Sequence, residues 1–378
     1  MINYLTVRDK SLERGLGSES DTDDLPGTVW GLMDGLSVLR RLSATALADQ
    51  PRYQETMRVD HPLSVLGPIE SCAMSASMSG LLGHRAFRTA VVPAAGLGTR
   101  FLPTTKTVPK ELLPVVDTPA IEYVAAEAAQ AGAERLVLVV SPGKESVAAH
   151  FDPNPDLEAE LRGRDMDALL AKVRRAPSLI RAEIALQHKP LGLGHAVGCA
   201  EPLLHDSDDA VAVLLPDDFV LPTGVLLTMG AIRRRHGGSV LCAFDVPREQ
   251  VCAYGVFDAE ETDDPDVKRV RRMVEKPAPE AAPSTLAAAG RYLLDRAVFG
   301  ALHRIAPGVG GEVQLTDAIA LLIDEGHPVH VVVHCGPRHD LGTPIGLLRA
   351  SVDFALADPD LGPELRSWLR DRLEQEST

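Results

Sequence analysis

The stretch Thr89–Pro103, "TAVVPAAGLGTRFLP", joins a strand-like apolar run to a glycine-rich turn. Its first six residues form a short apolar run that predicts a buried β-strand. Two glycines, an arginine and a proline follow at once, so the strand leads into a tight turn whose backbone N–H groups can approach phosphate oxygens. On these residues alone, the turn is either a cradle for phosphate or a plain connection.

The pattern after this stretch is regular. From Phe87 onward, β-rich runs alternate with helical segments, which predicts an α/β fold, a Rossmann-like three-layer sandwich with a mostly parallel central sheet. Helices are expected at 119–133, from 144 onward, and twice in the tail 344–375, where "DPDLGP" interrupts the pattern. Strands are expected at 89–94, 135–143, 183–189, 210–218, 239–246, 267–277, 287–295 and 329–335.

The beginning of the chain differs from the rest. Residues 1–86 are polar, turn-rich or filled with small residues, and only Val29–Leu47 could form a helix. We therefore expect 1–86 to be a mostly disordered N-terminal extension. Residues 87–343 then form the main domain, and 344–378 form helices that pack on it or mediate oligomerisation.

Composition restricts the partners of the protein. The chain has 378 residues, 45% of them hydrophobic, and a formal net charge of −15, which argues against nucleic acids and acidic membranes as partners. The longest apolar runs fall short of the roughly 20 residues of a membrane-spanning helix. The N-terminus lacks a basic region followed by an apolar core and a cleavage site. We expect a cytoplasmic protein.

Two common phosphate-binding motifs do not match the glycine turn. A dinucleotide-binding GxGxxG needs a third glycine after Gly96 and Gly98, but Phe101 stands there. A Walker A loop needs Gly-Lys followed by Ser or Thr, which this sequence lacks. However, Arg100, Lys106 and Lys110 place three cations on one proline-stiffened loop, which favours a phosphate site over solvated surface lysines.

The region 96–123, "GLGTRFLPTTKTVPKELLPVVDTPAIEY", resembles the signature region of the sugar nucleotidyltransferases, in detail that of bacterial members using UTP and glucose-1-phosphate. Four later motifs follow in the family's order: "PLGLGHAV", "LLPDD", "VEKP" and "GEVQLTDAI". The resemblance runs from about Thr89 to the end and does not include 1–86. It implies that 87–343 is a nucleotidyltransferase catalytic domain of the nucleotide-diphospho-sugar transferase type, in a homo-oligomer, either dimer or tetramer.

The implied reaction is attack of a glucose-1-phosphate oxygen on the α-phosphorus of UTP, giving UDP-glucose and pyrophosphate. Both substrates are polyanions, so the protein must align them and neutralise charge rather than supply a base. By the resemblance, Arg100 and Lys110 hold the β- and γ-phosphates, and Lys276 contacts the phosphate that joins sugar to nucleotide. These three are the expected catalytic residues.

The resemblance also implies a Mg²⁺ ion held by Asp217, in "LLPDD", and Asp340, in "RHDLGTP", with Asp218 as the substitute for Asp217. Asp217 follows an apolar strand, where open α/β sheets place ligands, although it could instead cap a helix. Thr343 stands where many relatives carry asparagine. The residues expected to bind substrate are Ala94, Ala95, Gly96, Leu97, Gly98, Glu111, Gln187, Gly192, Gly194, Gly255 and Glu275.

Some of these assignments have alternatives. Glu111 and Gln187 resemble uracil-reading residues but could be ordinary polar side chains, and Glu275 is either a ligand of the glucose hydroxyls or a surface residue. For His195 we expect a structural role. Three alternative functions stay open. The enzyme could transfer from dTTP, CTP or GTP, or the protein could bind sugar nucleotide as a catalytically inactive sensor. The N-terminal extension could also bind a partner or regulate the enzyme.

Overall fold

The computed structural model describes residues 86–376. The expected N-terminal extension, with its helix candidate at Val29–Leu47, lies outside the described residues except for Ala86. Residues 86–375 belong to one compact unit.

The main sheet contains nine strands in the spatial order β5-β4-β1-β6-β11-β8-β12-β10-β9. Four of them, β5, β4, β1 and β6, run parallel. β11 is antiparallel to β6 and pairs with both β8 and β9, so β11, β8, β12, β10 and β9 close into a ring. The strands are β1 (Thr89–Pro93), β4 (Arg135–Val140), β5 (Arg181–Leu186), β6 (Ala210–Leu214), β8 (Ser239–Asp245), β9 (Gly255–Glu261), β10 (Val267–Glu275), β11 (Leu286–Asp295) and β12 (Val329–Val333).

The α/β class is confirmed, but the expectation of a mostly parallel central sheet is wrong. In the described part of the main sheet outside β5-β4-β1-β6, the one parallel pair is β8–β12. The pairs β6–β11, β11–β8, β10–β12, β10–β9 and β11–β9 are antiparallel. The hydrophobic pattern that identifies a strand is the same in both directions. Strand direction therefore depends on pairings between distant segments, which periodicity does not show.

Apolar side chains cover both faces of the parallel segment, which gives the three layers. In β1, Ala90 and Val92 belong to one core cluster and Val91 belongs to another, because successive side chains point to opposite faces. The first cluster includes side chains from α2 (Ala120–Gln130) and α7 (Val225–His236), and the second includes side chains from α6 (Leu193–Cys199), α8 (Ala297–Leu302) and α9 (Leu315–Asp324).

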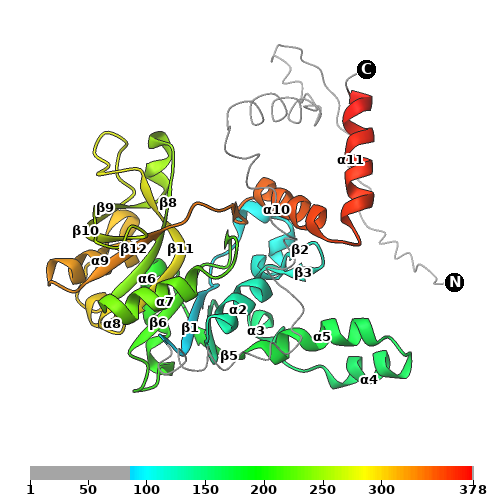
Figure 1. Cartoon of the computed structure of the whole chain (residues 1–378). Helices are drawn as coiled ribbons and strands as arrows, with labels where there is room; N and C mark the ends of the chain where they lie inside the picture. The colour runs from blue at the N-terminus through cyan, green and yellow to red at the C-terminus, as the bar shows by residue number, and fades with distance from the viewer. Residues whose placement is uncertain (1–85, 377–378) are drawn as a thin grey trace, which may run out of the picture. The chain divides into compact units, whose positions relative to one another are not determined.

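The long connection between β1 and α2 is not helical over more than one turn. Its prolines leave three short 3-10 turns and a pair of two-residue strands. Three helices, α3 (Ser146–Ala149), α4 (Pro155–Gly163) and α5 (Asp167–Leu179), follow β4, and α4 and α5 form a hairpin (Figure 1). The short elements of the connection are η3 (Thr99–Phe101), η4 (Thr104–Lys106), η5 (Lys110–Leu112), β2 (Pro114–Val115) and β3 (Thr118–Pro119).

Two helices, α10 (Pro344–Ala357) and α11 (Gly362–Glu376), form the C-terminal part. The Phe354 ring of α10 packs against the rings of Tyr123, at 5.2 Å, and Phe219, at 5.9 Å. The Thr343 side chain caps α10 by accepting from the Gly346 N–H at 3.2 Å, a role that asparagine fills equally well. No helix among residues 86–376 combines the length and apolar character needed to cross a membrane.

Candidate functional site

The candidate site lies at one edge of the parallel segment. Since β5, β4, β1 and β6 run in the same direction, their carboxyl ends meet at this edge. The segments that follow these ends are the glycine turn after β1, the Lys144 turn after β4, Gln187 after β5, and Pro216–Asp217 after β6. The sheet thus gathers segments that are far apart in the sequence.

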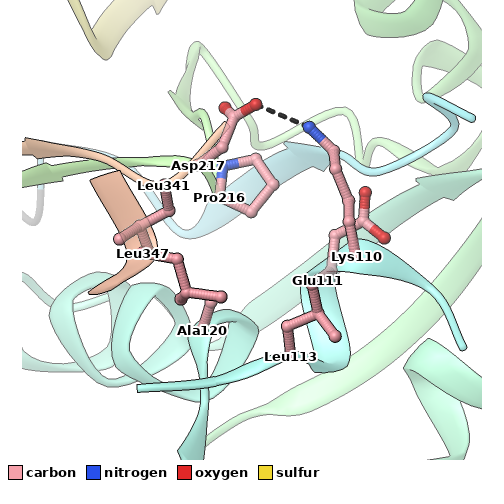
Figure 2. A pocket seen from close by; sticks show the side chains of 8 residues that line it. All are labelled: Lys110, Glu111, Leu113, Ala120, Pro216, Asp217, Leu341 and Leu347. Carbon is pink, nitrogen blue, oxygen red and sulfur yellow. Dashed lines mark hydrogen bonds and ion pairs between the residues drawn. The ribbon is translucent and has the colours of Figure 1, made fainter. Parts of the chain in front are cut away.

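Lys110 and Asp217 meet at this edge. Lys110 Nζ, on η5, lies 2.5 Å from Asp217 Oδ2, and Figure 2 shows the two side chains pointing toward each other above a small pocket. The far side of that pocket is apolar, formed by Leu113, Leu341 and Leu347 among others. The polar rim belongs to the predicted site, whereas the apolar part lies between the β1–α2 connection and α10.

Asp340 and Arg100 lie close to Asp217, and all three side chains surround Gly342. A methyl group added to Gly342 would meet Asp340 Oδ1 at 2.9 Å, Asp217 Oδ2 at 3.4 Å and Arg100 Nη1 at 3.5 Å. The Leu341 N–H donates to the Asp217 carbonyl oxygen at 2.7 Å, which ties the two acidic segments together. Two cations and two carboxylates therefore share one small volume.

Asp218 has a different environment from Asp217. Asp218 belongs to β7 (Asp218–Val220), which pairs with β13 (Arg338–Asp340), and it is only 5% exposed. Its carboxylate accepts from Arg338 at 2.6 and 3.0 Å and from the Gly290 N–H at 2.6 Å. Arg338 in turn stacks on the Phe244 ring at 4.1 Å. These partners occupy Asp218, so the structure offers no support for Asp218 as the substitute metal ligand.

The residues present fit a magnesium ion. Asp217 and Asp340 bring two carboxylates together, and Mg²⁺ binds through one or two carboxylates together with substrate phosphates and waters. Residues 86–376 contain no group of three or more His, Cys, Asp or Glu side chains suited to hold a metal. The ion would accordingly need oxygens from a phosphate ligand.

A partly buried lysine, Lys144, contacts the backbone of the glycine turn. Lys144 Nζ donates to the carbonyl oxygens of Ala94 and Gly96, and it lies 2.7 Å from Glu111 Oε2. Burial raises the pKa of the Glu111 carboxyl above its ordinary value, against the opposing effect of the Lys144 charge. Burial also lowers the pKa of the Lys144 ammonium. Sequence reasoning did not place Lys144 in the site.

Gln187 is held in one orientation. Its Nε2 donates to the Gly192 carbonyl oxygen at 3.2 Å and lies 2.9 Å from His195 Nδ1. Because a carbonyl oxygen only accepts, the amide nitrogen faces Gly192, and His195 Nδ1 then accepts as well. His195 thus orients Gln187, consistent with the structural role favoured above.

Close packing accounts for two of the predicted glycines. A Cβ on Gly192 would lie 2.8 Å from Glu312 Cβ, and Gly192 has a φ of +101°. A Cβ on Gly194 would lie 2.8 Å from the Val313 carbonyl oxygen, to which the Gly194 N–H donates. The side-chain direction of both glycines is therefore filled by the segment before α9, and their lack of a side chain has a packing reason.

A second group of predicted residues meets where β9 and β10 pair. Gly255 lies opposite Glu275, whose Oε2 accepts from the Thr316 hydroxyl at 2.7 Å. Lys276 has a φ of +44°, which is unusual for a residue with a side chain, and its N–H donates to the Tyr254 carbonyl oxygen at 2.9 Å. Thr316, at the start of α9, was not among the predicted residues although it orients Glu275.

The predicted residues thus fall into four local groups: Arg100, Lys110, Asp217 and Asp340; the glycine turn with Glu111; Gln187 with Gly192 and Gly194; and Gly255, Glu275 and Lys276. Lys106 is exposed, and its side chain makes no hydrogen bond or ion pair within residues 86–376. The signal that could have found Lys144 is its position directly after a buried strand at the ligand-binding edge.

The α/β fold places Arg100 and Lys110 beside a glycine turn at the carboxyl ends of parallel strands, an arrangement that suits a phosphate-bearing ligand. The model of the family described as nucleotidyl transferase matches residues 89–355. The chain belongs to this family.

Several relatives are similar over nearly their whole length. The Bacillus subtilis UTP–glucose-1-phosphate uridylyltransferase YngB is 39% identical over 77% of this chain and 97% of its own. A Streptococcus pneumoniae UTP–glucose-1-phosphate uridylyltransferase is 40% identical over 75% of this chain and 95% of its own. Among solved structures, the UTP-bound UGPase from Acinetobacter baumannii has a TM-score of 0.68 at 37% identity, over 75% of this chain and 98% of its own.

Proposed function

We propose that this protein is a uridylyltransferase that makes UDP-glucose and pyrophosphate from UTP and glucose-1-phosphate. The observation that carries the proposal is the meeting of Arg100, Lys110, Asp217 and Asp340 beside the glycine turn. The names of the similar proteins support the choice of base and sugar.

In the proposed reaction, an oxygen of the glucose-1-phosphate phosphate forms a bond to the α-phosphorus of UTP. The bond from this phosphorus to the oxygen bridging to the β-phosphate breaks, and pyrophosphate leaves with that electron pair. A phosphate monoester is already a nucleophile at neutral pH, so the task of the protein is alignment and charge neutralisation. Arg100 and Lys110 are assigned to the β- and γ-phosphates, and Lys276 to the phosphate that will link sugar and nucleotide.

We assign Asp217 and Asp340 to a Mg²⁺ ion, which when bound would neutralise phosphate charge in the transition state. The glycine turn, Glu111 and Gln187 are assigned to the nucleotide. Glu275, which Thr316 orients, is assigned to the sugar hydroxyls. Gly192 and Gly194 are proposed to shape the base side of the site through their packing on 312–314.

We also propose 87–343 as the catalytic domain, with α10 packed on it. The homo-oligomeric state and the cytoplasmic location stay predictions.

The test is pyrophosphate release by the full chain with glucose-1-phosphate and each of UTP, dTTP, CTP and GTP, with Mg²⁺ and with a chelator. We expect UTP to give the highest kcat/KM, and turnover to stop with the chelator and return with excess Mg²⁺. Faster release from dTTP, CTP or GTP would favour the alternative transfer from that nucleotide. Substrate binding without any release would favour the silent sensor.

A further inference from the structure

Lys144 is a partly buried cation that the mechanism above does not use. It lies in the turn between β4 and α3, and its side chain is 13% exposed. Its ammonium has three donors, and it has three acceptors in the structure: the carbonyl oxygens of Ala94 and Gly96 and Glu111 Oε2. These partners lie 50, 48 and 33 residues away in the chain. Three partners from other parts of the chain therefore fix the position of the Lys144 ammonium.

The contacts of Lys144 with two carbonyl oxygens fix the orientation of the peptide groups in the glycine turn. In a trans peptide, the carbonyl of one residue points opposite to the N–H of the next. Lys144 draws the carbonyls of Ala94 and Gly96 toward itself, so the N–H groups of Ala95 and Leu97 point away from it. Within residues 86–376, neither of these N–H groups donates a hydrogen bond. Both are therefore available to an anionic ligand.

The contact with Glu111 joins the same lysine to a second part of the nucleotide site. Glu111 is only 2% exposed, and its other oxygen, Oε1, is buried and has no hydrogen-bond partner among residues 86–376. An unpaired buried carboxylate is costly, so Glu111 depends on Lys144 for its position and its charge. Oε1 is left free to accept a hydrogen bond from a ligand.

We propose that Lys144 is a positioning residue for the nucleotide, which orients the amides of the glycine turn toward the phosphates and holds Glu111 in place through one ammonium group. This inference rests on the proposed function. It assigns no contact between Lys144 and substrate, and it predicts an effect on the nucleotide rather than on the sugar phosphate.

The experiment compares Lys144→Met with Lys172→Met in the full chain. Lys172 is an exposed lysine paired with Asp117, so its replacement controls for the loss of one ion-paired lysine. For Lys144→Met we expect the KM for UTP and the Kd for UTP, measured by calorimetry without glucose-1-phosphate, to rise about tenfold or more. The KM for glucose-1-phosphate should change less than about twofold. Lys172→Met should leave all three values unchanged.

A double-mutant cycle with Glu111→Gln tests the link to Glu111. If Lys144 acts through this carboxylate, the double variant should lose less UTP affinity than the product of the two single losses. Lys144→Arg, which keeps the charge and the donors, should recover part of the affinity. If Lys144→Met does not fold, Lys144→Gln, which keeps a donor without the charge, serves in the same measurements.

The proposal would be overturned by an unchanged UTP affinity in folded Lys144→Met, by equal increases in both KM values, or by independent effects in the cycle. Failure of the proposed function looks different. In that case the wild-type protein would bind UTP and form no UDP-glucose, while Lys144→Met would still weaken UTP binding.

Discussion

Lys110 and Asp217, 107 residues apart in the chain, form an ion pair of 2.5 Å at the edge of the sheet. Without a ligand, the cation assigned to the phosphates and the carboxylate assigned to the metal thus neutralise each other. On the proposed roles, we expect substrate binding to replace this contact: a phosphate would pair with Lys110, and Asp217 would be released to hold a metal ion.

The first prediction concerns this pair. Asp217 is partly exposed, so its ion pair contributes at most about 1 kcal/mol to stability. We expect Lys110→Met and Asp217→Asn to unfold within about 1 kcal/mol of the wild type, but to lower kcat/KM about 100-fold or more because transition-state charge is no longer neutralised. Urea unfolding and pyrophosphate release measure the two effects. Near-normal turnover in either variant would remove that residue from the site.

The second prediction concerns the backbone of Lys276, whose φ of +44° costs about 1 kcal/mol for a residue with a Cβ. We expect Lys276→Gly to relieve this strain and raise the melting temperature, while activity falls strongly because the ammonium is lost. Lys276→Ala is the matched control: it should lose the same activity without the gain in stability. An active Lys276→Gly variant would show that the charge is dispensable.

The third prediction concerns the buried ion pair between Arg291 and Glu127, near the carboxyl end of β6. Arg291 is 1% exposed and lies 2.8 Å from Glu127, and it also donates to the carbonyl oxygens of Leu215 and Gly290. Removing one charge leaves the other buried and unpaired, so Arg291→Met or Glu127→Leu should each cost about 3–5 kcal/mol in urea unfolding. The double variant should cost less than the two single costs added together. Simple additivity would mean that the charges do not interact.

The fourth prediction concerns pH. Burial lowers the pKa of His330 below its usual 6.5, and the charges of His236 and Arg269 lower it further. The unfolded chain therefore takes up the proton first. His330 contributes its full stabilisation above about pH 6.5, and loses it as the pH falls from there through the lower pKa of the folded state.

Replacing His330 with leucine should make the free energy of unfolding less sensitive to pH between 7.5 and 5.5. His339, whose pKa burial also lowers, adds a similar dependence in both proteins and does not affect their difference. Equal pH dependence in the wild type and the variant would contradict this role of His330.

Most strands could be predicted from the sequence because burial leaves a local pattern. β1, β4, β6, β8 and β12 are continuous apolar runs, and all five were expected. The short strands β2, β3, β7 and β13, the strand β9, and the helices α4 to α8 were not expected. α4 and α5 are mostly exposed helices that bury few side chains, so burial leaves little apolar pattern in them.

The α/β class, the family and the phosphate-binding character of the site could be predicted from the sequence, because they depend on local hydrophobic pattern and on short motifs such as "GLGTR" and "LLPDD". Three features became visible only in the folded chain: the mixed strand directions of the sheet, the different environments of Asp217 and Asp218, and the contact of Lys144 with the glycine turn. Each of these depends on contacts between segments distant in the chain, whose energies no local pattern records.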